Sequence, residues 1–298
     1  MWDAASRSLL WVDIAGRRLH CLHAPSGEQR DWALPEEPGC IGLVAADAES
    51  PAQSYPEEVV VALRSGFHLF NLRREVLQRL SEPLFDTTRY RFNDGTVDPR
   101  GRFWAGTLFE PKSEASGGLY CLERGHARAV TGPGAAAAPW KDWGVKTSNG
   151  LAFSPDARTL YHSDTPAHIV YAYDYDATVG AIANRRTWWQ APSDRDAPDY
   201  GGRPDGAAVD AAGCYWTAQY EGGRVLRLSA QGSVLRALAL PARCPTMVAF
   251  GGPDLRTLYV TSARQGRPAA ELQALPLSGF VFAVPVEVAG LPVNRYAK

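Results

Sequence analysis

Three polar residues, Asn93, Asn149 and Asp205, each stand five positions before the turn residue that ends an apolar, strand-like run. The turn residues are Asp98, Ser154 and Asp210. Two amides and a carboxylate supply hard oxygen ligands of the kind that divalent cations prefer. If the strands repeat around a common axis, this spacing predicts one cation site.

Each of these residues also has a simpler explanation. Asn149-Gly150 and Asp205-Gly206 are ordinary turn dipeptides, and Asn93-Asp94-Gly95 can form a turn as well. Turn chemistry explains each residue alone but not their common position in three successive units. Counting back five positions from the turn residue reaches Gly42 in an earlier unit and Thr246 in a later one. The shared position therefore favours a ring of equivalent side chains.

The element that must position these residues is a β-hairpin. Val97 ends one strand, and Asp98-Pro99-Arg100-Gly101 has Pro and Gly where a type I turn prefers them. Phe103-Trp104-Ala105 begins the returning strand. The sequence predicts a hairpin with a polar cluster at its open end.

The chain contains six copies of this hairpin. The returning strands are centred on Trp11, Val61, Trp104, Tyr161, Trp216 and Tyr259, and a further strand-like run follows each one, at 18–22, 67–70, 118–122, 169–173, 224–228 and 280–284. A strand-rich unit repeated at this interval predicts an all-β fold, a six-bladed β-propeller formed as a single domain by residues 1–298. A two-sheet sandwich would not predict the repeat. Equivalent side chains would then lie at the mouth of the central channel.

The composition excludes several classes of protein. Basic and acidic residues number 31 and 32, without a basic stripe for nucleic acid. The five cysteines are scattered and predict reduced, packed thiols. No apolar run is long enough to span a membrane, and we expect a cytoplasmic protein, a monomer or weak homodimer.

No G-x-S-x-G or phosphate-loop motif occurs, and His162 within a strand is expected to be packed.

Three polar or Pro/Gly-rich stretches interrupt the repeat, at 48–58, 131–147 and 191–203. The last two lead directly into the first strand of a unit. Loops at that end of a propeller blade often shape binding sites. We therefore expect these two insertions to border the site.

At this point the motifs resemble the regucalcin and gluconolactonase family over essentially the whole chain. The segments that carry the resemblance are Arg91-Phe92-Asn93-Asp94-Gly95, Val97-Asp98-Pro99, Gly101-Arg102-Phe103-Trp104-Ala105-Gly106-Thr107, Ser148-Asn149-Gly150-Leu151, Pro204-Asp205-Gly206, Gly222-Gly223-Arg224-Val225 and Gly290-Leu291-Pro292. The resemblance implies a six-bladed propeller that hydrolyses a sugar lactone with one divalent cation (Ca, Mn, Zn, Mg or Fe). It implies Asn149 and Asp205 as metal ligands, and Arg91, Asn93 and Asp94 as substrate contacts. Glu110, near the same mouth, is a further candidate substrate contact.

A glutamate ligand of that family precedes the tryptophan matched by Trp2, so its counterpart would stand three residues before Met1. We expect a chain without this glutamate to bind the cation more weakly and to turn over lactones poorly. Asp205 is the candidate general base, because a carboxylate ligand has a second oxygen that can accept a proton from water. Two other functions fit the same residues: hydrolysis of a non-sugar lactone or ester, and cation binding without catalysis.

Overall fold

The computed structural model describes residues 1–45, 54–132, 134–135 and 142–298. The turn residue Asp47 and parts of the insertions at 48–58 and 131–147 lie outside the described residues. The described chain divides into two compact units. Unit 1 comprises Met1–Ser148, Asp176–Ala181 and Pro292–Lys298, and unit 2 comprises Asn149–Tyr175 and Ile182–Leu291.

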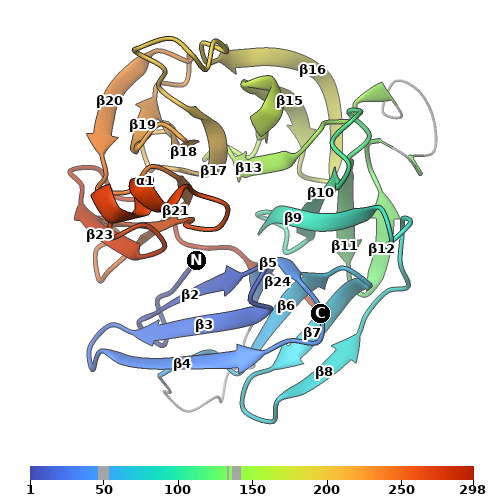
Figure 1. The fold of residues 1–298 in the computed structure, drawn as a ribbon. Coiled ribbons are helices and arrows are strands. Elements are labelled where there is room, and N and C mark those ends of the chain that lie inside the picture. Colours follow the sequence, from blue (N-terminus) through green and yellow to red (C-terminus); the bar gives the residue numbers. More distant parts are fainter. Residues whose placement is uncertain (46–53, 133, 136–141) are drawn as a thin grey trace. The chain divides into compact units, whose positions relative to one another are not determined.

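Unit 1 is built from sheets in which neighbouring strands follow one another in the chain (Figure 1). The first contains β1 (Trp2–Asp3), β2 (Ser8–Asp13), β3 (Arg18–His23) and β4 (Glu28–Ala33). The second contains β5 (Pro38–Val44), β6 (Glu58–Leu63), β7 (Gly66–Asn71) and β8 (Val76–Arg79), and the third β9 (Tyr90–Val97), β10 (Phe103–Phe109), β11 (Leu119–Glu123) and β12 (His126–Ala129). The strand β24 (Arg295–Tyr296) pairs in parallel with β5 and covers the edge of β5 that does not face β6.

Unit 2 repeats the pattern. Its first sheet contains β13 (Ser148–Phe153), β14 (Thr159–Asp164), β15 (Ile169–Asp176) and β16 (Ala181–Gln190). The second contains β17 (Arg203–Val209), β18 (Tyr215–Tyr220), β19 (Arg224–Leu228) and β20 (Val234–Ala239). The third contains β21 (Pro245–Gly251), β22 (Thr257–Ser262) and β23 (Val281–Pro285). A short helix, α1 (Ala269–Ala274), stands between β22 and β23. Every strand run predicted from the repeat is present.

Buried aspartates explain why the hairpin motif recurs. Asp98 accepts hydrogen bonds at Oδ1 from the backbone N–H groups of Arg100 and Arg102 and at Oδ2 from Trp104 Nε1, at 2.8 to 3.1 Å. The carbonyl of Asp98 accepts the Gly101 N–H at 3.0 Å, and Gly101 has φ +81°, which a side chain would strain. One carboxylate thus ties the turn to the tryptophan of the returning strand.

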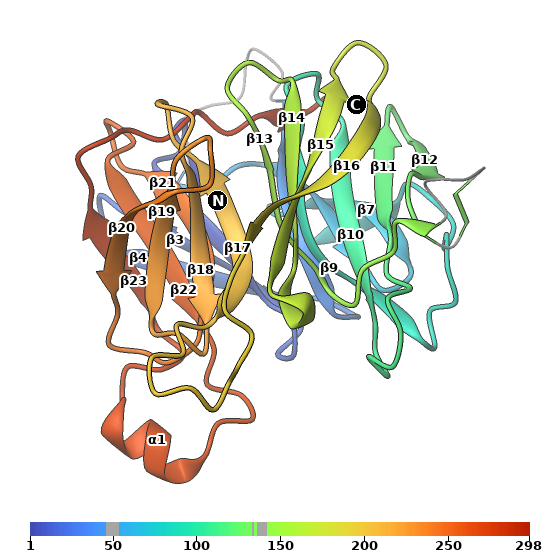
Figure 2. The same cartoon turned by 90° about the horizontal axis from the view of Figure 1, so that it is seen from above.

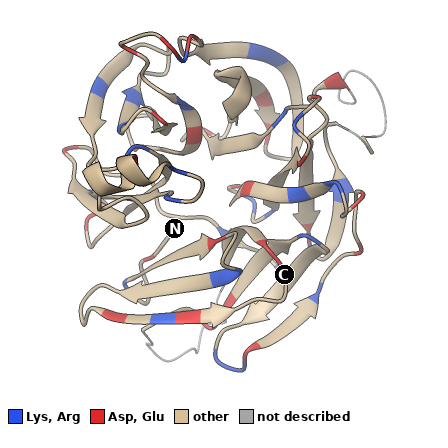
Figure 3. Ribbon diagram, viewed as in Figure 1, with Lys and Arg blue, Asp and Glu red and all other residues tan. Residues whose placement is uncertain are grey.

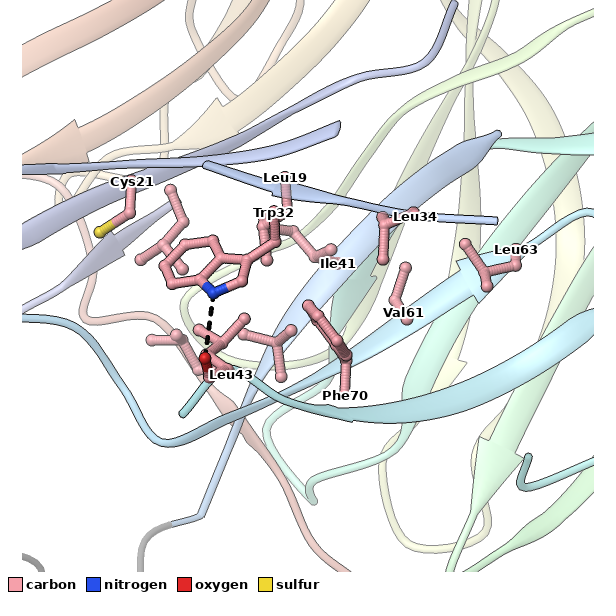
Figure 4. Close-up of a cluster of buried hydrophobic side chains, with 12 residues drawn as sticks. Leu19, Cys21, Trp32, Leu34, Ile41, Leu43, Val61, Leu63 and Phe70 are labelled. Carbon is pink, nitrogen blue, oxygen red and sulfur yellow. Dashed lines mark hydrogen bonds between the residues drawn. The ribbon is translucent and has the colours of Figure 1, made fainter. Parts of the chain in front are cut away.

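The core lies between consecutive sheets of each unit. In unit 1 one cluster packs side chains of β2–β4 against those of β5–β7, with Trp32 at its centre (Figure 4). Trp32 Nε1 donates to the Leu72 carbonyl at 3.0 Å, so its polar atom is satisfied within the apolar surroundings. In unit 2, Trp216 packs with Val248 and Phe250 in the same way. Burying an apolar side chain such as that of Val248 or Phe250 stabilises the fold by roughly 1.5–3 kcal/mol.

Charged residues are interspersed along the described strands and loops (Figure 3). All five cysteines are buried and free, as the sequence predicted, and burial raises the pKa of the Cys21 thiol to about 11. His162 is fully buried, as expected for a packed residue. Among the described residues, no helix has the length and apolar character required to cross a membrane.

Candidate active site

In the sheets that begin with β1, β5, β9, β17 and β21, the first and second strands are antiparallel, so the start of one lies beside the end of the other. Arg91 and Asn93 stand at the start of β9, and Glu110 directly follows the end of β10. Asp205 stands at the start of β17, opposite the end of β18. This topology brings candidate residues far apart in the sequence to one edge of each sheet.

A β-bulge occurs at this edge in four of the first strands. The pairing register shifts at Asn93 in β9, at Asp205-Gly206 in β17 and at Thr246 in β21. A bulge leaves its extra residue outside the ladder and re-aims its side chain, and such bulges are enriched next to active sites. Asn93, Asp205 and Thr246, which were all selected by counting back five positions from a turn residue, therefore each stand at a β-bulge.

Counting back five positions from the turn residue gives the wrong residue in the second sheet. In β5 the register shifts at Gly39, whereas Gly42 pairs regularly with Val60. The connection between β5 and β6 is longer than in the other hairpins, so counting back from its turn does not reach the equivalent residue.

The candidate substrate residues of unit 1 form a connected polar network. Arg91 Nη1 donates to the Phe92 carbonyl at 2.9 Å and to Asn93 Oδ1 at 3.0 Å. Asn93 Nδ2 donates to the carbonyl of Ser148 at 2.9 Å. These two bonds fix the orientation of the Asn93 amide and hold the guanidinium of Arg91 in place.

Glu110 connects Arg91 to a second arginine. Its carboxylate accepts two hydrogen bonds from Arg64, each of 2.9 Å, and lies 3.9 Å from Arg91 Nε. Arg64 also pairs with Glu37, at 3.2 Å. The bond from Arg64 lowers the pKa of Glu110, whereas burial lowers the pKa of Arg91. The network offers fixed donors and acceptors that suit the hydroxyls of a sugar.

Asp94 behaves differently from its neighbours. It is buried, its Oδ1 accepts the backbone N–H of Gly95 at 2.8 Å, and it pairs regularly with Gly106. These contacts stabilise the strand and its bulge. A direct role for Asp94 in binding substrate stays a prediction.

In unit 2, Thr165 links Asn149 through hydrogen bonds to Pro204, the residue before Asp205. Thr165 Oγ1 donates to the carbonyl of Pro204 at 2.7 Å, so it must accept the bond that Asn149 Nδ2 makes with it, also at 2.7 Å. The Asn149 amide nitrogen therefore faces Thr165, and this bond fixes the orientation of the whole amide, Oδ1 included. Pro204 directly precedes Asp205, so the network connects Asn149 to the segment that carries the carboxylate.

Glycine at position 150 allows this close approach. Gly150 has φ +57°, and a Cβ there would lie 2.3 Å from Tyr215 Oη and 2.8 Å from the Asp205 carbonyl. The carbonyl of Gly150 accepts a hydrogen bond from Tyr215 at 2.8 Å. Only glycine fits without displacing the two segments.

The donor set fits a hard divalent cation. Asn149 is largely buried and the partly exposed Asp205 lies in its bulge, and together they offer an amide oxygen and a carboxylate. Within the described ranges, no group of three or more His, Cys, Asp or Glu residues could hold a metal.

Sequence reasoning missed Arg64, Glu37 and Thr165. Arg64 directly follows the end of β6, the position that corresponds to Glu110 after β10, so comparing equivalent strand ends would have found it. Thr165 follows β14 in a 3₁₀ turn, Thr165–Ala167, and no local signal marks it.

Comparison with known proteins agrees with these motifs. The SMP-30/Gluconolactonase/LRE-like region matches residues 1–264. The chain is 46% identical over 300 residues to 6-deoxy-6-sulfogluconolactonase of Pseudomonas putida, covering 100% of this chain and 93% of that protein. This chain belongs to the SMP-30/gluconolactonase family. It is also 33% identical over 305 residues to regucalcin of Gallus gallus, covering 100% of this chain and 93% of that protein.

The solved structures agree as well. A calcium-binding protein, regucalcin, from Agrobacterium tumefaciens matches with a TM-score of 0.86 and 27% identity over 99% of this chain and 91% of that chain. The predicted fold, an all-β six-bladed β-propeller, is confirmed, and so is the predicted family. The predicted enzyme class, a hydrolase of the lactonase type, agrees with relatives named as lactonases.

Proposed function

We propose that this member of the SMP-30/gluconolactonase family hydrolyses a sugar lactone to its aldonic acid, with one divalent cation held by Asn149 and Asp205. The observation that carries the proposal is the chain of hydrogen bonds from Asn149 through Thr165 to the Pro204 carbonyl. It orients the amide oxygen of Asn149 and supports the segment that bears Asp205. The 46% identity to a 6-deoxy-6-sulfogluconolactonase supports a six-carbon lactone with a sulfonate on carbon 6 as substrate.

A bound cation would polarise the lactone carbonyl and lower the pKa of a water molecule. Asp205 accepts a proton from the attacking water as that water adds to the carbonyl carbon. The bond between this carbon and the ring oxygen then breaks, and the ring oxygen takes up the proton to become a hydroxyl. For unit 1, we propose that Arg91 and Asn93 bind hydroxyls of a sugar and that Glu110 holds Arg91 in position.

The decisive test is Asp205→Asn, which keeps the size of the side chain but removes its charge. We expect kcat for gluconolactone, measured in the presence of Mn²⁺ or Ca²⁺, to fall about 10²-fold or more. Cation affinity, measured by calorimetry, should fall as well, because affinity depends on the charge of the ligands. The matched control is Asp199→Asn at an exposed loop position, which should change neither. Full turnover and full cation affinity in the Asp205→Asn protein would disprove both roles.

A panel of substrates separates this proposal from the alternatives. Hydrolysis of non-sugar lactones or esters in preference to aldonolactones would indicate a different substrate class. Cation binding without hydrolysis of any lactone would indicate a binding protein.

A further inference from the structure

Three arginines of unit 2 converge on one buried carboxylate. Arg195, Arg203 and Arg267 lie 2.7, 3.0 and 3.2 Å from the carboxylate of Glu221. Glu221 is 8% exposed and follows the end of β18. The three arginines come from the loop before β17, from the start of β17, and from the segment just before α1.

The cluster has an excess of positive charge. Among the described residues, the one other carboxylate that forms an ion pair with these arginines is Glu271, which binds Arg267 at 2.5 Å. Three guanidinium groups are therefore matched by two carboxylates. Each guanidinium has five N–H donors, more than these carboxylates can accept.

Three buried polar atoms in the same region have no hydrogen-bond partner. Arg203 Nε is buried without a hydrogen bond, and so are both polar atoms of Gln219, whose side chain is fully buried. Gln219 lies two residues before Glu221 and opposite Pro204 in the β17–β18 ladder. A buried polar group without a partner costs about 1–3 kcal/mol, so it calls for a functional explanation.

The cluster is well placed relative to Asp205. Arg203 precedes Asp205 by two residues, a distance of about 7 Å along a strand, so the two side chains start from neighbouring points of β17. The guanidinium of Arg203 also lies 5.2 Å from the ring of Tyr220. This stacking holds Arg203 at the strand start that carries the candidate metal ligand.

Neighbouring segments support the arginines. Tyr200 binds His168 at 2.9 Å, and Arg224 donates to the carbonyl of Gly201 at 3.1 Å, so the loop before β17 is tied to the sheets. Arg267 binds Glu271 on α1 through two hydrogen bonds. The loop and α1 extend beyond the same ends of the unit 2 strands (Figure 2).

We propose that Arg195, Arg203 and Arg267, with the amide of Gln219, form a subsite for a tetrahedral oxyanion, a sulfonate or phosphate, on carbon 6 of the lactone. Planar guanidinium forks bind such groups through paired, charge-assisted hydrogen bonds. The subsite rests on the proposed function, because it assigns the end of the substrate opposite the carbonyl. Glu221 gathers the arginines and keeps them in position without substrate.

The experiment compares kcat/KM for 6-deoxy-6-sulfogluconolactone, 6-phosphogluconolactone and gluconolactone. We expect the unmodified protein to prefer one or both anionic substrates, and the preferred one identifies the oxyanion. Arg203→Gln should reduce the ratio of anionic to neutral kcat/KM by about 10- to 100-fold, the value of a hydrogen bond to a charged group. Arg195→Gln, at a more exposed loop position, should reduce the same ratio. Because Arg195 lies outside the strands, this variant tests the subsite even if Arg203→Gln fails to fold.

The matched control is Arg236→Gln on β20, which should leave the ratio unchanged. Gln219→Leu provides an independent readout. Removing two buried polar atoms that lack partners should raise the melting temperature while lowering the ratio, whereas a purely structural glutamine would lower the melting temperature and leave the ratio unchanged.

The outcomes separate the subsite from the activity. Equal kcat/KM for all three lactones, with no change of ratio in Arg203→Gln, would overturn the subsite and leave the lactonase intact. Hydrolysis of none of them would overturn the proposed function. In that case the subsite is tested by calorimetric binding of 6-deoxy-6-sulfogluconate, and equal affinity in unmodified and Arg203→Gln proteins would overturn it too.

Discussion

At the scale of single residues, Arg91 shows how the fold prepares a polar side chain for binding. Its Nη1 is bonded to Phe92 and Asn93, and Glu110 lies near its Nε. These contacts hold the planar fork in one orientation, so little conformational entropy would be lost in the proposed binding of substrate. Burial lowers the pKa of Arg91, but an arginine stays charged at any pH relevant to the protein.

Arg91→Lys should therefore raise KM for the sugar lactone by about 10-fold, with a smaller effect on kcat, because lysine keeps the charge but loses the fork. Steady-state kinetics with gluconolactone measure both constants. The control is Arg89→Lys, an exposed arginine that stacks on Phe109. If kcat fell as much as kcat/KM, the interaction would be made only in the transition state, and Arg91 would be more than a binding residue.

At the scale of the element, the buried aspartate of the hairpin determines stability. Asp210 is fully buried and accepts four hydrogen bonds, from the backbone of Ala212 and Cys214, from Trp216 Nε1 and from Arg227 Nε, all at 2.9 Å. It repeats the role of Asp98 in unit 1. The turn and the returning strand therefore depend on one carboxylate.

Asp210→Ala should lower the free energy of unfolding by about 3 kcal/mol or more, because it leaves several buried donors without an acceptor. Urea denaturation followed by tryptophan fluorescence measures the change. Asp156→Ala is the matched control: Asp156 occupies the corresponding turn after β13, but its bonds are exposed. A loss in Asp210→Ala no greater than in the control would show that the backbone alone holds the hairpin.

At the scale of the whole chain, buried histidines link stability to pH. His68, His162 and His168 are buried, and burial lowers the pKa of each, that of His162 to about 3. The unfolded chain takes up these protons near the ordinary histidine pKa of about 6.5, whereas the folded chain resists protonation. Their contribution is thus present above about pH 6.5 and is lost as the pH falls towards 3.

We expect the free energy of unfolding to decrease below pH 6.5, with a slope approaching about 1.4 kcal/mol per pH unit for each such histidine. Denaturation curves between pH 4 and pH 7 measure this slope. His162→Gln should reduce the slope, and His126→Gln, at an exposed position, should not. An identical slope in the His162→Gln protein would mean that other groups control the acid sensitivity.

Much of the fold could be predicted because its signals are local. The turn at Asp98-Pro99-Arg100-Gly101 and the apolar residues around it specify a hairpin, and the same chemistry recurs at Asp210. The candidate site was reached by counting within this repeat. Counting back from the turn reaches a bulge residue in β9, β17 and β21, but it was wrong at Gly42, because a long connection changes the register.

The sequence by itself determined the repeated hairpins, the family and the residue types available for cation and sugar binding, since each depends on neighbours in the chain. Only the tertiary structure decided which distant charges meet. Arg64 joins Glu110 across 46 residues, and Arg267 joins Glu221 across 46 residues in the other unit. Such pairs arise because adjacent sheets bring together the ends of strands that are far apart in sequence. No periodic pattern records them, since a long-range contact depends on how whole sheets pack.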